Sequence, residues 1–123
     1  MEKDAMKREI EQVYTLAERQ GSLPELMEAI GVVLAAHPQA LAHLTHSYRL
    51  ISADTGYTTA FALTAGAFAW LPEGQSVDVE ITGKERDLLA VFQRKVAPLK
   101  ALLLGKVKLK GDKAALLKLG EFL

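Results

Sequence analysis

The sequence contains no cysteine, few aromatic residues and no long apolar run. The absence of cysteine excludes disulfide bonds and thiolate chemistry. No uninterrupted apolar stretch approaches the roughly 20 residues that a membrane-spanning helix requires. The first residues, MEKDAMKREIEQ, are charged and do not resemble a secretory signal. We therefore expect a soluble, cytoplasmic protein.

The sequence also has few of the polar patterns that are typical of enzymes. It contains no Gly-x-Ser-x-Gly elbow and no glycine-rich phosphate loop. His37, His43 and His46 could be metal ligands, but surface or packing histidines are favoured, because no cysteine and few acidic residues accompany them. Asp78 and Glu80 could act as paired carboxylates, although the solvated face of a strand is the favoured explanation. We expect no catalysis, no metal and no cofactor.

The length and composition fit one folded domain. The chain has 123 residues, of which 50% are hydrophobic and 24% are charged. This balance is typical of a chain with a buried core rather than of a disordered one. A chain of this length buries enough surface to fold without disulfides or metals. The sequence therefore predicts a single domain over residues 1–123.

Positive charge is concentrated in the last third of the chain. Residues 1–83 contain 5 Lys and Arg against 11 Asp and Glu, whereas residues 84–118 contain 10 against 3. A basic segment of this kind could contact an anionic membrane, a phosphate or nucleic acid. Nucleic acid is disfavoured, because no aromatic residue lies between Phe92 and Phe122. The alternative to membrane contact is a solvated face that protects an exposed strand. The candidate membrane or headgroup contacts are Lys100, Lys106, Lys108 and Lys110.

Two helices are predicted in the first third of the chain. Met6, Ile10 and Val13 recur at the spacing of one helical face, which predicts a helix over residues 4–20. Residues 22–25 match a capping box with Ser22 as the N-cap. The helix that follows should end before Pro38, because the residue before a proline is pushed out of helical geometry. A short helical turn over residues 38–44 is expected next.

Alternating apolar and polar residues predict five strands, over residues 45–52, 57–63, 67–71, 77–82 and 106–110. Short connections between the first four predict a meander of antiparallel neighbours. Helices are predicted over residues 85–97, 99–104 and 113–119. Most strands have bulky residues on one face and small or polar ones on the other, which suits helices on one face only. The sequence therefore predicts an α+β fold, with a five-stranded, mainly antiparallel sheet and helices packed on one face.

The second half of the chain contains GKVKLKGDKAALLKL, preceded by a Leu-rich helical segment and by VDVEITG, and AIGVVLAAHPQALAHL lies further upstream. These residues resemble the sterol carrier protein 2 lipid-transfer family. The resemblance covers roughly residues 26–120. The resemblance implies a hydrophobic tunnel between the sheet and the helices that holds sterols, fatty acids, acyl-CoA or phospholipid. It also implies that a lone domain of this kind is not generally an enzyme.

A partly unfilled apolar interior follows from the one-sided strands and the Leu- and Phe-rich helices. We expect a pocket of roughly 300–1,000 Å³, the size typical of small-ligand sites. The candidate ligand-binding residues are the bulky residues on the expected inner faces of strands and helices: Tyr48, Leu50, Phe61, Leu63, Phe68, Trp70, Val79, Ile81, Leu88, Phe92, Leu103 and Leu117. Any one of them could instead simply fill the core.

Two functions remain open at this point. The first is non-catalytic binding, and transfer, of an apolar lipid such as a fatty acid, fatty acyl-CoA, phospholipid, sterol or isoprenoid. The second is an accessory or scaffold module that presents a quinone or isoprenoid lipid to a partner enzyme. Lipid that co-purifies with the protein would favour the first function.

Overall fold

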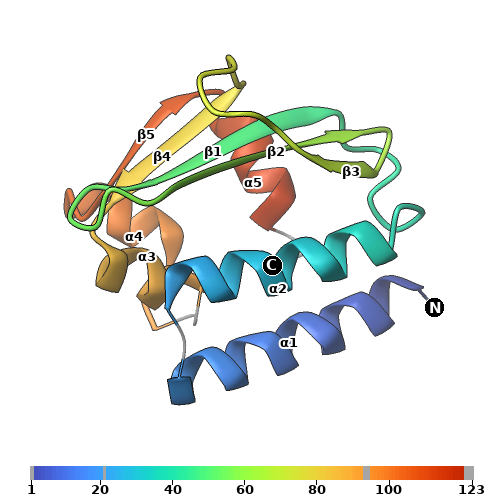
Figure 1. Cartoon of the computed structure of the whole chain (residues 1–123), viewed down its shortest axis with the longest axis horizontal. Helices are drawn as coiled ribbons and strands as arrows, with labels where there is room; N and C mark the ends of the chain where they lie inside the picture. The colour runs from blue at the N-terminus through green and yellow to red at the C-terminus, as the bar shows by residue number, and fades with distance from the viewer. Residues whose placement is uncertain (1, 21, 93–94, 121–123) are drawn as a thin grey trace.

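The computed structural model describes residues 2–20, 22–92 and 95–120, and Figure 1 shows their arrangement. Along the chain, two helices are followed by four strands, two helices, one strand and a last helix, which agrees with the predicted α+β fold. The helices are α1 Glu2–Gln20, α2 Leu23–Ala36, α3 Glu85–Phe92, α4 Pro98–Leu103 and α5 Lys113–Gly120. The strands are β1 His46–Ser52, β2 Thr58–Thr64, β3 Ala67–Trp70, β4 Val79–Gly83 and β5 Val107–Gly111. No helix within these residues is long and apolar enough to cross a bilayer.

The five strands form one sheet in the order β3-β2-β1-β4-β5. Three neighbouring pairs are antiparallel and β1 pairs with β4 in parallel, so the predicted mainly antiparallel sheet is confirmed. The predicted four-strand meander is wrong, because β4 lies beside β1 and not beside β3. The chain between Trp70 and Val79 crosses over the sheet, and the guanidinium of Arg49 donates a hydrogen bond to the Gln75 carbonyl there.

All five helices lie on one side of the sheet, as Figure 1 shows. α2 is between the sheet and α1, and the buried residues Met6, Ile10, Ile30 and Leu34 join these two helices to the core. The predicted helices on one face of the sheet are therefore confirmed. Within the described residues, no helix covers the opposite face of the sheet.

The start of α2 follows the predicted cap in part. The Ser22 hydroxyl accepts a hydrogen bond from the Glu25 backbone N–H at 3.4 Å, and α2 ends at Ala36, before Pro38. A carboxylate from outside the helix also serves this end, because Glu85 Oε1 accepts from the Leu23 N–H at 2.7 Å. This contact joins the first turn of α2 to the first turn of α3.

Two helical predictions differ from the structure. Residues 38–44 form hydrogen-bonded turns rather than a helix, with Leu44 N donating to Leu41 O at 2.8 Å. α3 ends at Phe92 instead of continuing to residue 97; residues 93–94 lie outside the described part of the chain. Residues 95–97 are not helical, and the backbone before Pro98 is extended, as the ring of a following proline favours.

Candidate functional site

An apolar cavity of about 620 Å³ lies between the sheet and the helices. Its lining comes from every helix and from strands β1, β2, β4 and β5. Apolar side chains dominate the wall, and the polar exceptions are few. The residues that line it are Tyr14, Met27, Ile30, Tyr48, Arg49, Leu50, Phe61, Ile81, Leu88, Val91, Phe92, Val96, Ala97, Leu102, Val107, Leu109, Lys113, Leu116, Leu117 and Leu119.

The sheet supplies one wall of this cavity. Leu50 of β1 is opposite Ile81 of β4, and Ile81 is opposite Leu109 of β5, so the three side chains form a row across the sheet. Beside this row, the rings of Tyr48 and Phe61 stack with centroids 5.2 Å apart. Strand alternation places all five residues on the face that meets the helices.

The last three helices supply most of the other wall. α3 contributes Leu88 and Phe92, which are one helical turn apart and so share a face. α4 contributes Leu102, and α5 contributes Leu116 and Leu117. Leu88 is fully buried, whereas Leu117 is 55% exposed and therefore lies at the rim of the cavity.

The hydroxyl of Tyr48 is the best-defined polar group of the wall. It donates a hydrogen bond to the Ala115 carbonyl of α5 at 3.1 Å. Burial raises the pKa of Tyr48 to about 12, and the negative charges of Asp78 and Asp112 add to the effect. The phenol is therefore neutral at physiological pH and is occupied as a donor within the protein, which does not suit a catalytic base.

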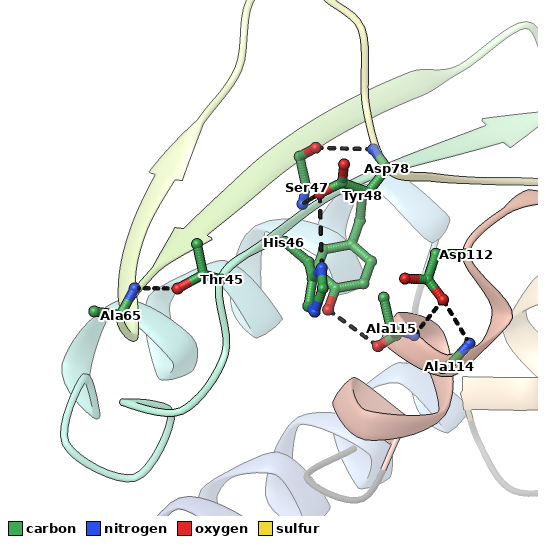
Figure 2. A network of polar contacts seen from close by, with 9 residues as sticks. All are labelled: Thr45, His46, Ser47, Tyr48, Ala65, Asp78, Asp112, Ala114 and Ala115. Atoms are coloured by element: carbon green, nitrogen blue, oxygen red, sulfur yellow. Dashed lines mark hydrogen bonds and ion pairs between the residues drawn. The ribbon is translucent and has the colours of Figure 1, made fainter.

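A polar network next to the cavity fixes the position of α5, and Figure 2 shows it in close view. Ser47 and Asp78 exchange hydrogen bonds, from Ser47 N to Asp78 Oδ2 and from Asp78 N to Ser47 Oγ, each at 2.9 Å. The Asp78 carbonyl accepts from Asp112 N at 3.0 Å. Asp112 Oδ1 then accepts from the backbone N–H groups of Ala114 at 2.9 Å and Ala115 at 3.2 Å, which caps α5. These polar groups are engaged in holding the helix against β1 and β4.

Of the twelve sequence-predicted ligand residues, seven lie in the cavity wall. They are Tyr48, Leu50, Phe61, Ile81, Leu88, Phe92 and Leu117. The structure brings these residues together from β1, β2, β4, α3 and α5. Whether they contact a ligand stays a prediction.

The other five predicted residues, Leu63, Phe68, Trp70, Val79 and Leu103, lie away from the cavity wall. Leu63 and Val79 are on the inner face of the sheet, but they are fully buried in the packed core. Phe68 and Trp70 pack edge to face, 4.9 Å apart, against the backbone of α2. Leu103 is 79% exposed, because its neighbour Leu102 occupies the side of α4 that faces the cavity.

Several wall residues were missed from the sequence. Tyr14 of α1 and Met27 and Ile30 of α2 line the cavity, but nothing in the sequence distinguishes them from residues that only fill a core. Val107 and Leu109 could have been predicted. They alternate with lysines along β5, which indicates that these two side chains point to the inner face of the sheet.

The four candidate membrane lysines are exposed and come from different parts of the fold. Lys108 and Lys110 alternate with Val107 and Leu109, which line the cavity, so the two lysines lie on the outer face of the sheet. Lys100 belongs to α4, and Lys106 follows the turn between α4 and β5. Their contact with a membrane stays a prediction.

The three histidines do not form a cluster. His37 pairs with Glu9 of α1, and His46 Nδ1 lies 3.7 Å from Asp78 Oδ2. Among the residues that the structure describes, no group of three or more His, Cys, Asp or Glu side chains could hold a metal ion. His37 and His46 are thus each paired with a single carboxylate.

One family model matches this chain, and solved structures share its fold. The model of the SCP-2 sterol transfer family matches residues 28–123. No curated protein matches the chain. The palmitated SCP2L2 protein from Aedes aegypti is 24% identical, with a TM-score of 0.59 over 81% of this chain and 92% of that protein.

Two other solved structures share the fold. UbiJ-SCP2, described as a ubiquinone synthesis protein, is 13% identical, with a TM-score of 0.62 over 78% of this chain and 84% of that one. The sec-alkylsulfatase Pisa1 from Pseudomonas sp. is 20% identical, with a TM-score of 0.68 over 84% of this chain. The match spans only 16% of the length of that enzyme. At these identities the similarities show the fold alone.

Proposed function

The chain belongs to the SCP-2 sterol transfer family, and from this we propose that it binds an apolar lipid in the cavity beneath the sheet and transfers it. The family implies lipid binding and transfer. The ligand class that we propose is a fatty acid, a fatty acyl-CoA, a phospholipid, or a sterol or isoprenoid.

The cavity itself is the observation that carries this proposal. Protein interiors are close-packed, and voids larger than a water molecule are few. A space of about 620 Å³ is within the range of sites for small organic ligands. Its wall is formed by aliphatic and aromatic side chains, which favour a ligand with a large apolar part.

We propose that the binding is not coupled to a reaction on the ligand. Family members are lipid carriers and generally not catalysts. The polar groups beside the cavity support this view, because Tyr48, Asp78 and Asp112 are each engaged in bonds that hold α5 in place. The activity of the sulfatase with the similar fold belongs to a much longer protein.

A second role is an accessory module that presents a quinone or isoprenoid lipid to a partner enzyme. The similarity to a ubiquinone synthesis protein favours keeping this alternative. It uses the same cavity, and it differs from the carrier role in requiring a stable protein partner.

Native mass spectrometry of the protein after mild extraction tests the proposal. We expect a bound species with the mass of a lipid, and we expect it to be lost in Ile81→Trp, in which an indole ring occupies part of the cavity. Thr82→Trp is the matched control, because the neighbouring residue of β4 points to the opposite face of the sheet. A protein free of lipid that also fails to take up added fatty acid, acyl-CoA, phospholipid or sterol would contradict the proposal. Lipid found only together with a partner enzyme would favour the accessory role.

A further inference from the structure

The turn between α4 and β5 exposes two consecutive leucines. Leu103 is 79% exposed and Leu104 is 56% exposed, which is unusual for large apolar side chains that are neighbours in sequence. Gly105 follows with a φ of +72°, a conformation that favours glycine and lets the chain reverse sharply. Figure 1 shows α4 beneath β5 at one end of the sheet.

Backbone hydrogen bonds hold this turn in shape. Leu104 N donates to Lys100 O at 3.0 Å, Gly105 N donates to Leu102 O at 3.1 Å, and Lys106 N donates to Ala101 O at 3.0 Å. Ala101 itself is buried in the core and anchors the segment. The two leucines are therefore presented to solvent by a defined turn.

The exposed leucines lie next to the cavity wall in the chain. Leu102, immediately before them, and Val107, immediately after the turn, both line the cavity. The exposed leucines are thus neighbours in the chain of residues that line the cavity.

Charge near the turn favours one kind of surface. Residues 88–111 contain six Lys and Arg residues and no Asp or Glu. Two of these, Lys100 and Lys106, are exposed and flank the two leucines. Leucines bordered by lysines match the boundary of an anionic bilayer, where apolar side chains enter the acyl region and ammonium groups contact headgroups.

We propose that residues 100–106 dock the protein on anionic membranes, with Leu103 and Leu104 inserted and Lys100 and Lys106 on the headgroups. This docking brings the cavity wall to the membrane, and it rests on the proposed lipid-binding function. Lys108 and Lys110 have no part in it, because they lie on the outer face of the sheet.

Co-sedimentation with phosphatidylcholine vesicles, with and without phosphatidylserine, tests the docking. Wild type should bind only the anionic vesicles, and less as salt is raised. The double variant Leu103→Ser/Leu104→Ser should lose at least about tenfold in partition coefficient, because burial of a leucine side chain is the main apolar gain. Lys100→Gln/Lys106→Gln should lose up to roughly thirty-fold, which corresponds to about 1 kcal/mol for each lysine.

Two variants serve as matched controls. Lys108→Gln/Lys110→Gln removes the same charge from the outer face of the sheet, and Val32→Ser removes an exposed apolar side chain from α2, where Val32 is 70% exposed. Both should bind vesicles within about twofold of wild type. An equal loss in the lysine control would overturn the assignment to this turn, since net charge alone would then explain binding.

Two further results would also overturn the docking. One is the absence of wild-type binding to anionic vesicles. The other is a concentration-dependent dimer, seen by analytical ultracentrifugation, that Leu103→Ser/Leu104→Ser abolishes while vesicle binding stays unchanged. In that case a second copy of the chain covers the leucines. Titration of a soluble fluorescent fatty acid without vesicles reports the cavity alone. If fatty acid, acyl-CoA, phospholipid and sterol all fail to bind in the absence of vesicles while vesicle binding is normal, the proposed function is refuted and the docking stands.

Discussion

Replacing Leu50 and Leu63 separately by alanine should give different losses of stability, although both are buried leucines on the inner face of the sheet. Leu63 is 1% exposed and packed in the core, whereas Leu50 is 5% exposed and lines the cavity. Leucine-to-alanine changes in protein cores cost about 2–5 kcal/mol, according to how much packing is lost. Because part of the Leu50 surface faces an open cavity, it has fewer packing partners to lose.

We therefore expect Leu63→Ala to lower the free energy of unfolding by about 4–5 kcal/mol and Leu50→Ala by about 2–3 kcal/mol. Urea denaturation measures both free energies. The slope of the unfolding free energy against urea concentration should be the same in wild type and both variants, so that the differences report stability alone. Titration with a fluorescent fatty acid should find altered affinity only in Leu50→Ala. Equal stability losses, or altered affinity in Leu63→Ala alone, would refute the distinction between cavity wall and packed core.

Three other substitutions probe the cavity wall, the attachment of α5 and the packing on α2. Replacing a fully packed phenylalanine by alanine costs about 3–5 kcal/mol of unfolding free energy, and Phe92→Ala should cost clearly less. In ligand titrations the same variant should weaken fatty acid binding or shift it towards bulkier chains. Tyr48→Phe should lose about 1 kcal/mol at neutral pH through the missing hydrogen bond to Ala115. The raised pKa of Tyr48 stabilises the fold below pH 10.0, and this contribution is lost as the pH rises to about 12. The difference in unfolding free energy between wild type and Tyr48→Phe, measured by urea melts, should therefore narrow over that pH interval. Gly31→Ala should destabilise by about 1–3 kcal/mol, because the added methyl group would overlap the Trp70 ring, and a thermal melt equal to that of wild type would contradict this packing.

Local patterns in the sequence determined much of the fold. Alternation along residues 77–82 and 106–110 identified two strands, and Ser22 identified the start of α2. The placement of β4 beside β1 was beyond such patterns, because it depends on the path of the chain after Trp70. A short connection normally joins adjacent antiparallel strands, so the crossing over the sheet left no local signal.

The cavity wall was predicted less completely than the fold. Alternation tells which face of a strand is buried, but it does not tell whether helices fill the space beneath each residue. Leu50 and Leu63 therefore gave the same pattern, although only Leu50 lines the cavity. The run of three leucines at 102–104 was ambiguous for a similar reason, since successive helical residues point in different directions and the sequence does not say which one faces inward.

Methyl NMR of the protein titrated with a fatty acid shows whether lipid binds in the cavity between the sheet and the helices. Samples labelled at Ile, Leu and Val methyl groups report on both the cavity wall and the packed core. We expect saturable shifts at Leu50, Ile81 and Leu109, which form one row across the sheet, and little change at Leu63 and Leu41 in the core. Shifts confined to core or surface methyl groups, or no saturable shift with fatty acid, acyl-CoA, phospholipid or sterol, would contradict lipid binding in this cavity.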